Sequence, residues 1–368
     1  MHYGDLMKKE CIKLAESYAL ELNNFLENKN QAPKEFLNSA FRKYVCPVAI
    51  EPKFGGIGGN FSDIYIFNKI TAEKTGNTGA ALTGLISQIV LKIIDRYGSE
   101  NLKKNIFTQA LEKGTIFSFA VSEPKTGPHP KHMKTTALKK NNKYILKGIK
   151  TFITNGPVCD YSLVTAITRE DKKKYYSILI APSNHPDITS EHIENLPFFK
   201  DSFHGTLNFD SAALDSSALL GEEDKAYEKI VMKFRKYEDI LMAGTVLGAC
   251  SNLFNSVTSK LNTAELEKNI FYESGSIKVL LKTLDFLSLK ACEELENENE
   301  ITDYLHIFFR MEADTLVDKI KNLCNENSAS LDSKEKEILN DLENAGKIAF
   351  KAYFNKTIKI GENKFFNV

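Results

Sequence analysis

The sequence predicts an α+β protein with an N-terminal helical domain, a central antiparallel β-domain and a C-terminal four-helix bundle. The period of the hydrophobic residues is helical up to about residue 117, strand-like through the middle third, and helical again after Gly221. The predicted domains are therefore residues 1–117, 118–221 and 222–368. With 368 residues, 42% of them hydrophobic, the chain has enough material for a buried core without a disulfide or metal scaffold.

The N-terminal third has apolar residues at helical spacing. The first such set is Leu14, Ala15, Tyr18, Ala19 and Leu22. The stretch 63–74 repeats this pattern, and 80–97 is so apolar that we expect it to be buried. A glycine-rich loop at 52–59 lacks the preceding strand and the Lys-Ser/Thr pair of a phosphate-binding loop, so we interpret it as a connection between helices.

The middle third contains short runs of β-branched and aromatic residues separated by turn residues. These runs are residues 117–122, 144–152, 162–168, 175–181 and 206–209. Their length and their turns predict a small antiparallel sheet or barrel. After Gly221 the candidate helices are 222–261, 277–296, 303–325 and 334–355, and polar breaks separate them as in an antiparallel bundle.

Composition excludes several function classes. Lys+Arg and Asp+Glu are 48 each, so no global basic field is present to hold nucleic acid. The six cysteines form no CxxC pair, which argues against a structural zinc site or any other metal site. No run approaches 18 uninterrupted apolar residues, and the N-terminus lacks the apolar run of a secretory signal. We therefore expect a cytoplasmic protein without a membrane partner.

The most specific stretch lies between Gly114 and Asp160. It reads Phe-Ala-Val-Ser-Glu-Pro at 119–124, Tyr-Ile-Leu-Lys-Gly-Ile-Lys at 144–150 and Thr-Phe-Ile-Thr-Asn-Gly at 151–156. In order, spacing and residue type, this series resembles the middle domain of the acyl-CoA dehydrogenase family. The resemblance implies an oxidoreductase of fatty acid metabolism that uses FAD to introduce an α,β double bond into an acyl thioester of CoA or of an acyl carrier protein. It also implies a homo- or hetero-oligomer of dehydrogenase-like subunits.

A flavin site needs a flat apolar wall and hydrogen bonds to the ring edge. Phe119 and Phe152 supply two aromatic faces, and Ser122 and Thr154 supply two hydroxyls on neighbouring predicted strands. The resemblance implies that these four residues and Val121 line the FAD, with Thr154 within hydrogen-bond reach of the ring edge. The alternative is that they are ordinary strand residues.

The reaction needs a carboxylate to take the α-proton. The Tyr-Glu-Gly-Thr loop that carries this glutamate in most of the family is absent, and the nearest string contains Glu362. A second family arrangement places the base on the first bundle helix, and here Glu238 precedes Ala243 and Gly248 at its spacing. The resemblance therefore implies Glu238 as the base and Glu362 as the alternative. Asp239 stands where the family usually has arginine, and a neighbouring carboxylate raises the pKa of a base.

Other family features are missing. Ala264 and Gly275 stand where the family usually has an arginine and a glutamine, and residues 323–328 replace a glycine-rich segment. In the family, this arginine and these glycines contact the cofactor across a subunit interface. The resemblance therefore implies FAD that is weakly bound or absent. Three hypotheses follow: a divergent dehydrogenase, an inactive paralogue that acts as a partner subunit or acyl-thioester binder, and another flavin reaction such as that of an oxidase or monooxygenase.

Overall fold

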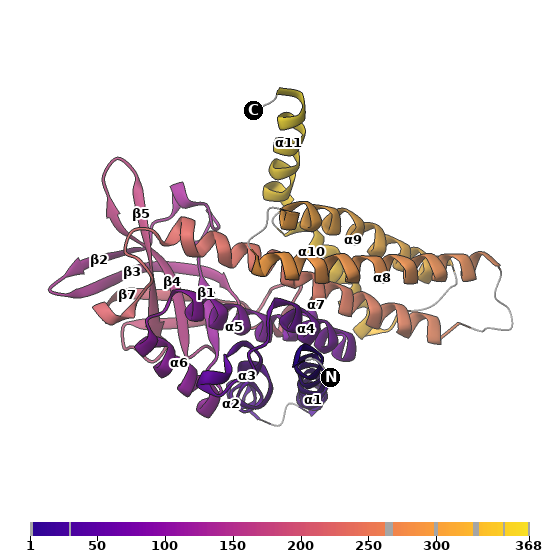
Figure 1. Cartoon of the computed structure of the whole chain (residues 1–368), viewed down its shortest axis with the longest axis horizontal. Helices are drawn as coiled ribbons and strands as arrows, with labels where there is room; N and C mark the ends of the chain where they lie inside the picture. Colours follow the sequence, from indigo (N-terminus) through magenta and orange to yellow (C-terminus); the bar gives the residue numbers. More distant parts are fainter. Residues whose placement is uncertain are drawn as a thin grey trace.

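The computed structural model describes residues 3–28, 31–261, 268–297, 301–326, 331–348 and 350–366. Figure 1 shows the sheet at one end, the long C-terminal helices at the other, and the N-terminal helices alongside both. This arrangement confirms the predicted fold class.

The N-terminal third consists of helices. They are α1 (Tyr3–Asn28), α2 (Pro33–Ala40), α3 (Cys46–Ala49), α4 (Phe61–Thr75), α5 (Thr78–Tyr97) and α6 (Glu100–Lys113). A capping box starts α4, in which the Asn60 side chain accepts from the Asp63 N–H and the Asp63 carboxylate accepts from the Asn60 N–H, both at 3.0 Å. As expected, α5 is buried over most of its length.

The glycine-rich loop folds against the chain just before it. The N–H groups of Gly58 and Gly59 donate to the carbonyl oxygens of Ile50 (2.8 Å) and Val48 (2.7 Å). A Cβ on Gly56 would lie 2.0 Å from the Ile50 oxygen, so only glycine allows this approach. Because these amides are used internally, the loop is a helix connection, as the sequence predicted.

The central sheet follows the order β6-β7-β3-β2-β4-β5-β8, and β1 pairs with β4. The strands are β1 (Phe117–Ala120), β2 (Thr136–Lys140), β3 (Lys143–Ile153), β4 (Tyr161–Glu170), β5 (Lys174–Pro182), β6 (Ile188–His192), β7 (Gly205–Asp215) and β8 (Leu219–Leu220). Pairing is antiparallel except where β1 and β2 meet β4. The five predicted strands are present. The prediction missed β2, β6 and β8, because β2 and β6 are short and largely polar and β8 has only two residues.

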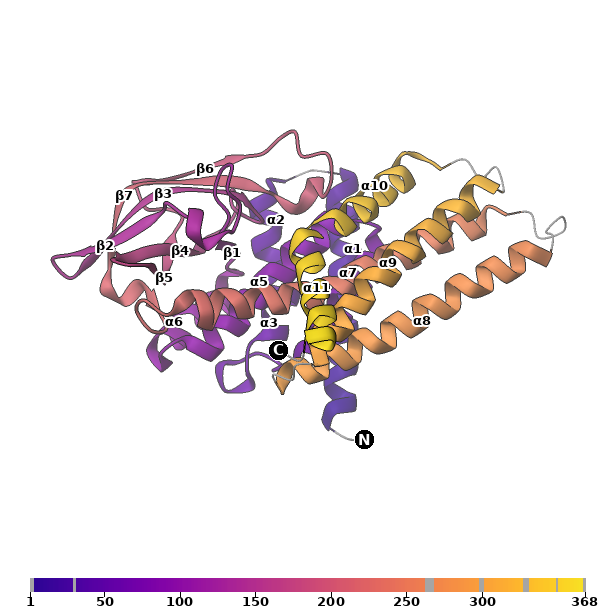
Figure 2. The ribbon, with the colours of Figure 1, turned by 90° about the horizontal axis from the view of Figure 1, so that it is seen from above.

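The C-terminal helices follow a π-helical turn at Tyr227–Val231. They are α7 (Met232–Ser259), α8 (Lys268–Glu296), α9 (Ile301–Glu326), α10 (Ser333–Lys347) and α11 (Phe350–Phe366). Figure 2 shows α8, α9 and α10 running beside one another at the end opposite the sheet. The single helix predicted at 334–355 is wrong, because the backbone is extended at Ile348 (φ −63°, ψ 131°) and separates α10 from α11, which projects from the body in Figure 1.

Two helical segments, 78–97 and 227–259, are long and apolar enough to cross a membrane by length and composition alone. In the folded protein, 89% and 72% of their most apolar windows are buried. Both segments therefore pack as core helices of this fold.

Two glycines bring α7 close to α4. A Cβ on Gly244 would lie 2.7 Å from the backbone carbonyl oxygen of Tyr65, and a Cβ on Gly248 would lie 2.2 Å from that of Lys69. The backbones of the two helices are therefore in direct contact at these positions. This contact explains physically why glycine stands at residue 248, and it fixes the position of α7 along α4.

A buried ion pair ties the segment after β1 to β3. The Lys150 Nζ lies 2.9 Å from the Glu123 Oε1, and both side chains are almost completely buried. Glu123 also accepts from the N–H groups of Lys134 (2.7 Å) and Thr135 (2.9 Å). Burial lowers the pKa of Lys150 to about 8, while the Glu123 charge opposes this shift. Burial alone would raise the pKa of Glu123, but the Lys150 charge and these hydrogen bonds hold it below its ordinary value.

We predict that Lys150→Met lowers the free energy of unfolding by about 3–5 kcal/mol, because it leaves the Glu123 carboxylate buried without its cation. Urea unfolding followed by circular dichroism measures this loss. Lys200→Met is the control, because its 2.9 Å pair with Glu337 is exposed and should contribute at most about 1 kcal/mol. Equal losses in the two variants would show that burial of the Glu123–Lys150 pair has no special effect.

Candidate active site

The structure brings the two predicted flavin-lining segments together. The Thr151 N–H donates to the Ser122 oxygen at 2.9 Å, and the Lys150 Nζ donates to the Val121 oxygen at 3.0 Å. Val121 and Ser122 are half-buried just beyond the end of β1. These hydrogen bonds hold residues 121–122 against the end of β3, as the predicted site requires.

Phe152 presents an aromatic ring at the surface of this region. Its backbone has a φ of +56°, which is uncommon for a non-glycine residue, and its side chain is 58% exposed. The register between β3 and β7 shifts between Lys150 and Ile153, so Phe152 lies in an irregular part of the strand pair. An exposed aromatic ring on a strained backbone is typical of a binding surface.

Phe119 lies differently from Phe152. Its ring is buried and stacks on Phe234 of α7, with 3.9 Å between the ring centroids and 10° between the ring planes. One face of Phe119 is therefore occupied by protein. A contact between Phe119 and a flavin stays a prediction, and the sequence did not indicate the partner Phe234.

Glu238 lies one helical turn beyond Phe234, on the same side of α7. The carboxylate is therefore placed next to the contact between α7 and β1. Glu238 is half-buried, and burial together with the Asp239 charge raises its pKa to about 7, while Arg235 opposes the shift. Asp239 lies 4.0 Å from the Arg235 Nε and 3.9 Å from the His306 Nε2. The negative charge that replaces the usual arginine is thus partly balanced by Arg235.

The alternative base lies elsewhere. Glu362 is exposed on α11, the helix that projects from the body in Figure 1. Gly275 is exposed on α8, and a Cβ there would meet no atom within 4 Å. Ala264 lies outside the described residues. Leu323 and Cys324, from the segment that replaces the glycine-rich stretch, are buried within α9.

Thr154 has a partner that sequence reasoning missed. Its Oγ1 lies 3.2 Å from the Nε2 of His204, and the Nδ1 of His204 is hydrogen-bonded to the Ser202 Oγ. Burial lowers the pKa of His204 to about 4, and His192 adds to the shift, so the ring is neutral near pH 7. Nothing in the sequence around His204 indicated a contact with a residue fifty positions earlier.

The residues around the end of β3 fit a flavin ring. They offer an exposed aromatic side chain, two half-buried hydroxyls and the backbone of residues 121–122. In the loop between β1 and β2, the Oγ1 of Thr126 is shielded from water and has no hydrogen-bond partner. This donor set suits an aromatic heterocycle with polar edges. On α8, Gly275 is exposed and has no side chain where the resemblance implies a glutamine that contacts the cofactor.

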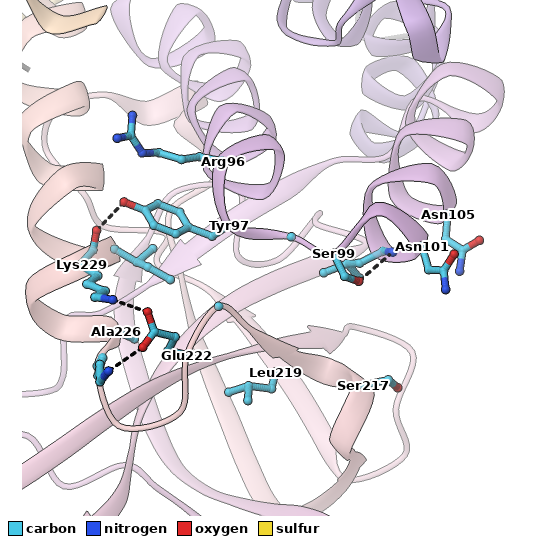
Figure 3. A pocket seen from close by; sticks show the side chains of 15 residues that line it. Arg96, Tyr97, Ser99, Asn101, Asn105, Ser217, Leu219, Glu222, Ala226 and Lys229 are labelled. Atoms are coloured by element: carbon cyan, nitrogen blue, oxygen red, sulfur yellow. Dashed lines mark hydrogen bonds and ion pairs between the residues drawn. The ribbon is translucent and has the colours of Figure 1, made fainter. Parts of the chain in front are cut away.

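A cavity of about 820 Å³ opens elsewhere, between the start of α6 and the chain around residues 221–230 (Figure 3). None of the predicted site residues lines it. Glu222 on its wall is hydrogen-bonded to Lys225 (2.6 Å) and Lys229, and the Tyr97 hydroxyl donates to the Lys229 carbonyl oxygen at 2.7 Å. These polar groups pair with one another, and we assign no role to the cavity.

Comparison with known proteins identifies the family. The family model described as "Acyl-CoA dehydrogenase, middle domain" matches residues 118–212. The mitochondrial long-chain specific acyl-CoA dehydrogenase of Rattus norvegicus is 26% identical over 256 residues, which are 68% of this chain and 58% of that protein. Residues 118–212 therefore form a middle domain of the acyl-CoA dehydrogenase family, and the sequence similarity to acyl-CoA dehydrogenases extends over about two thirds of the chain, 68%.

Solved acyl-CoA dehydrogenases have the same fold. The butyryl-CoA dehydrogenase of Megasphaera elsdenii superposes with a TM-score of 0.78 at 20% identity, covering 92% of each chain. A glutaryl-CoA dehydrogenase of Mycobacterium smegmatis, described in complex with FADH2, has a TM-score of 0.74 at 18% identity and covers 90% of this chain and 89% of its own. The aligned chain spans just under three fifths, 58%, of the rat acyl-CoA dehydrogenase.

The raised pKa of Glu238 predicts a pH-dependent stability. Between the ordinary pKa of 4.5 and about 7, the folded state holds a proton that the unfolded state has released. The free energy of unfolding should therefore fall as pH rises through this window. Glu238→Gln removes the loss, so the variant should become more stable than wild type above pH 7, by on the order of 1–3 kcal/mol.

Urea titrations at pH 4.5, 6 and 8 measure this difference. Glu362→Gln, which removes an exposed carboxylate on α11, controls for the simple loss of a negative charge. A gap between Glu238→Gln and wild type that stays constant across the three pH values would contradict the raised pKa.

Proposed function

We propose that the protein is an FAD-dependent dehydrogenase that introduces an α,β double bond into an acyl thioester of CoA or of an acyl carrier protein. The observation that carries the proposal is Glu238, a half-buried carboxylate with a raised pKa, one turn from the Phe119–Phe234 contact. The family relationship supports it, as does the bound FADH2 in the description of the M. smegmatis glutaryl-CoA dehydrogenase.

The chain's own residues have two tasks in this reaction. Phe152, Ser122 and Thr154 hold the flavin ring through one aromatic contact and two hydroxyls, and Glu238 takes the proton from the α-carbon of the thioester. Bound FAD supplies the acceptor for the hydride that leaves the β-carbon. A base with a pKa of about 7 suits this task, because near neutral pH it is substantially ionised and still binds a proton well.

We further propose that FAD binds more weakly here than in family members that retain the usual bundle contacts. Gly275 has no side chain where the family usually has glutamine. A lost hydrogen bond to a charged group costs on the order of 1.5–3 kcal/mol. Because nothing lies within 4 Å of a Cβ at residue 275, a larger side chain fits there.

We predict that Glu238→Gln abolishes the anaerobic bleaching of bound flavin by acyl thioesters while leaving FAD content unchanged, because glutamine keeps the shape and cannot take the proton. The wild-type rate should rise with pH through about 7 as Glu238 ionises. Stopped-flow absorbance with a series of acyl-CoA and acyl-carrier-protein substrates measures both effects.

Glu362→Gln is the matched control and should bleach at the wild-type rate. If the Glu362 variant loses activity and the Glu238 variant keeps it, the assignment of the base is wrong. The erosion of the bundle contacts favours a second candidate function, an inactive paralogue that acts as a partner subunit or acyl-thioester binder. Wild-type protein that binds FAD but bleaches with no thioester would favour that candidate.

We also propose that the chain self-associates through α8. Tyr272, Val279 and Phe286 recur every seven residues along this helix and are 73%, 68% and 70% exposed. Large apolar side chains repeated along one stripe of a helix are typical of a helix–helix interface. A second copy of this chain, or another dehydrogenase-like subunit, would cover this stripe.

We predict that Val279→Lys shifts the protein from oligomer to monomer, because it places a charge at the centre of the apolar stripe. Sedimentation velocity at micromolar concentration measures the change. Leu20→Lys is the control, because Leu20 is comparably exposed at 64% on α1. A wild-type monomer, or an equal effect of the two variants, would refute this interface.

A further inference from the structure

A chain of buried hydrogen bonds determines whether the Thr154 hydroxyl can donate its proton to a ligand. The chain consists of three side chains, Ser202, His204 and Thr154, and starts at the Phe199 carbonyl oxygen. Ser202 is completely buried, so water cannot replace any of its contacts. The direction of each hydrogen bond in the chain therefore follows from counting protons.

The Ser202 Oγ contacts the Phe199 oxygen, and because a carbonyl has no proton, the serine must donate. Because the serine hydroxyl has only this one proton, the Ser202 Oγ must be the acceptor in its hydrogen bond with His204, and the Nδ1–H of His204 must be the donor. His204 is therefore the neutral tautomer with its proton on Nδ1, a state that its lowered pKa supports.

The Nε2 of the neutral His204 has no proton, so at 3.2 Å it must accept from the Thr154 hydroxyl. The single proton of Thr154 thus points to His204, away from any ligand. Toward a ligand, the Thr154 oxygen offers lone pairs only.

We propose that the Ser202–His204–Thr154 chain holds the Thr154 hydroxyl as a hydrogen-bond acceptor in the flavin site and thereby favours the reduced flavin over the oxidised flavin. The proposal rests on the proposed function, because it assumes that the ring edge lies within reach of Thr154. Oxidised flavin has an unprotonated nitrogen at its central ring, where reduced flavin has an N–H donor. An acceptor facing this position stabilises only the N–H form. His204 is accordingly a positioning residue that acts through Thr154.

The first test needs no flavin. Nitrogen NMR of the full chain labelled with ¹⁵N-histidine reports the tautomer of each neutral ring, and the signal lost in His204→Phe identifies His204. The proposal requires a proton on Nδ1 and none on Nε2 at pH 7. A ring protonated on Nε2 would overturn it whether or not the protein binds FAD, so failure of the proposal is distinguishable from failure of the proposed function.

The second test is the midpoint potential of bound FAD, measured by dye equilibration. His204→Phe frees the Thr154 proton to donate to oxidised flavin, so the ratio of reduced to oxidised flavin at a fixed potential should fall about tenfold, which is about 30 mV for a two-electron couple. Ser202→Ala, the milder variant, should shift the potential in the same direction.

His192→Gln is the control, because it removes an exposed imidazole near His204 that is outside the hydrogen-bond chain. Its potential should equal that of wild type. If Ser202→Ala and His204→Phe bind FAD with an unchanged potential, the chain does not act on the flavin and the proposal fails. A potential that rises in these variants would also overturn it.

Discussion

The contact between Phe119 and Phe234 holds the candidate site together, because it joins the sheet to α7. An aromatic pair contributes about 0.5–1.5 kcal/mol beyond the area it buries, but its larger effect here is on geometry. It sets which side of α7 faces the end of β1, and Glu238 follows one turn later on that side. The glycine contacts between α7 and α4 add a second constraint, because they prevent the helix from sliding along its axis. Together they fix the position of Glu238 on α7 relative to the residues that are predicted to line the flavin.

The sheet side of the candidate site is held by an ion pair and hydrogen bonds, whereas the bundle side lacks the polar side chains that the resemblance implies. On the sheet side, the buried Glu123–Lys150 pair and the hydrogen bond from Thr151 to Ser122 hold the wall in place. On the bundle side, Gly275 has no side chain, and Leu323 is buried within α9. This asymmetry is the basis for the proposal that FAD binds more weakly here than in relatives that keep the usual bundle residues.

Features that depend on the local spacing of hydrophobic residues could be predicted from the sequence. The five hydrophobic strands, the burial of α5 and the pairing of residues 121–122 with the end of β3 were all predictable from period and motif. The missed strands β2 and β6 are largely polar, so they have no hydrophobic run to detect. The break at Ile348 lies within a continuous helical pattern, and there Arg310 of α9 donates to the carbonyl oxygens of Gly346 and Ile348, a tertiary contact that the pattern does not encode.

The missed site residues depend on tertiary contacts. Phe234 is one apolar residue among many on α7, and only the fold shows that it stacks on Phe119. His204 contacts Thr154 across fifty positions of sequence, a separation that no local motif encodes. The exposure of Phe152 follows from a left-handed backbone in an irregular strand pair, which its residue type does not suggest.

Every function proposed for this protein depends on a flavin site between the end of β3 and the adjoining face of α7. The visible absorbance spectrum of the purified protein, recorded during titration with FAD against a matched FAD blank, tests the flavin site most directly. We expect flavin bands that are perturbed from those of free FAD and saturate at one FAD per chain. Bands that stay identical to those of free FAD throughout the titration would contradict a flavin site at this position.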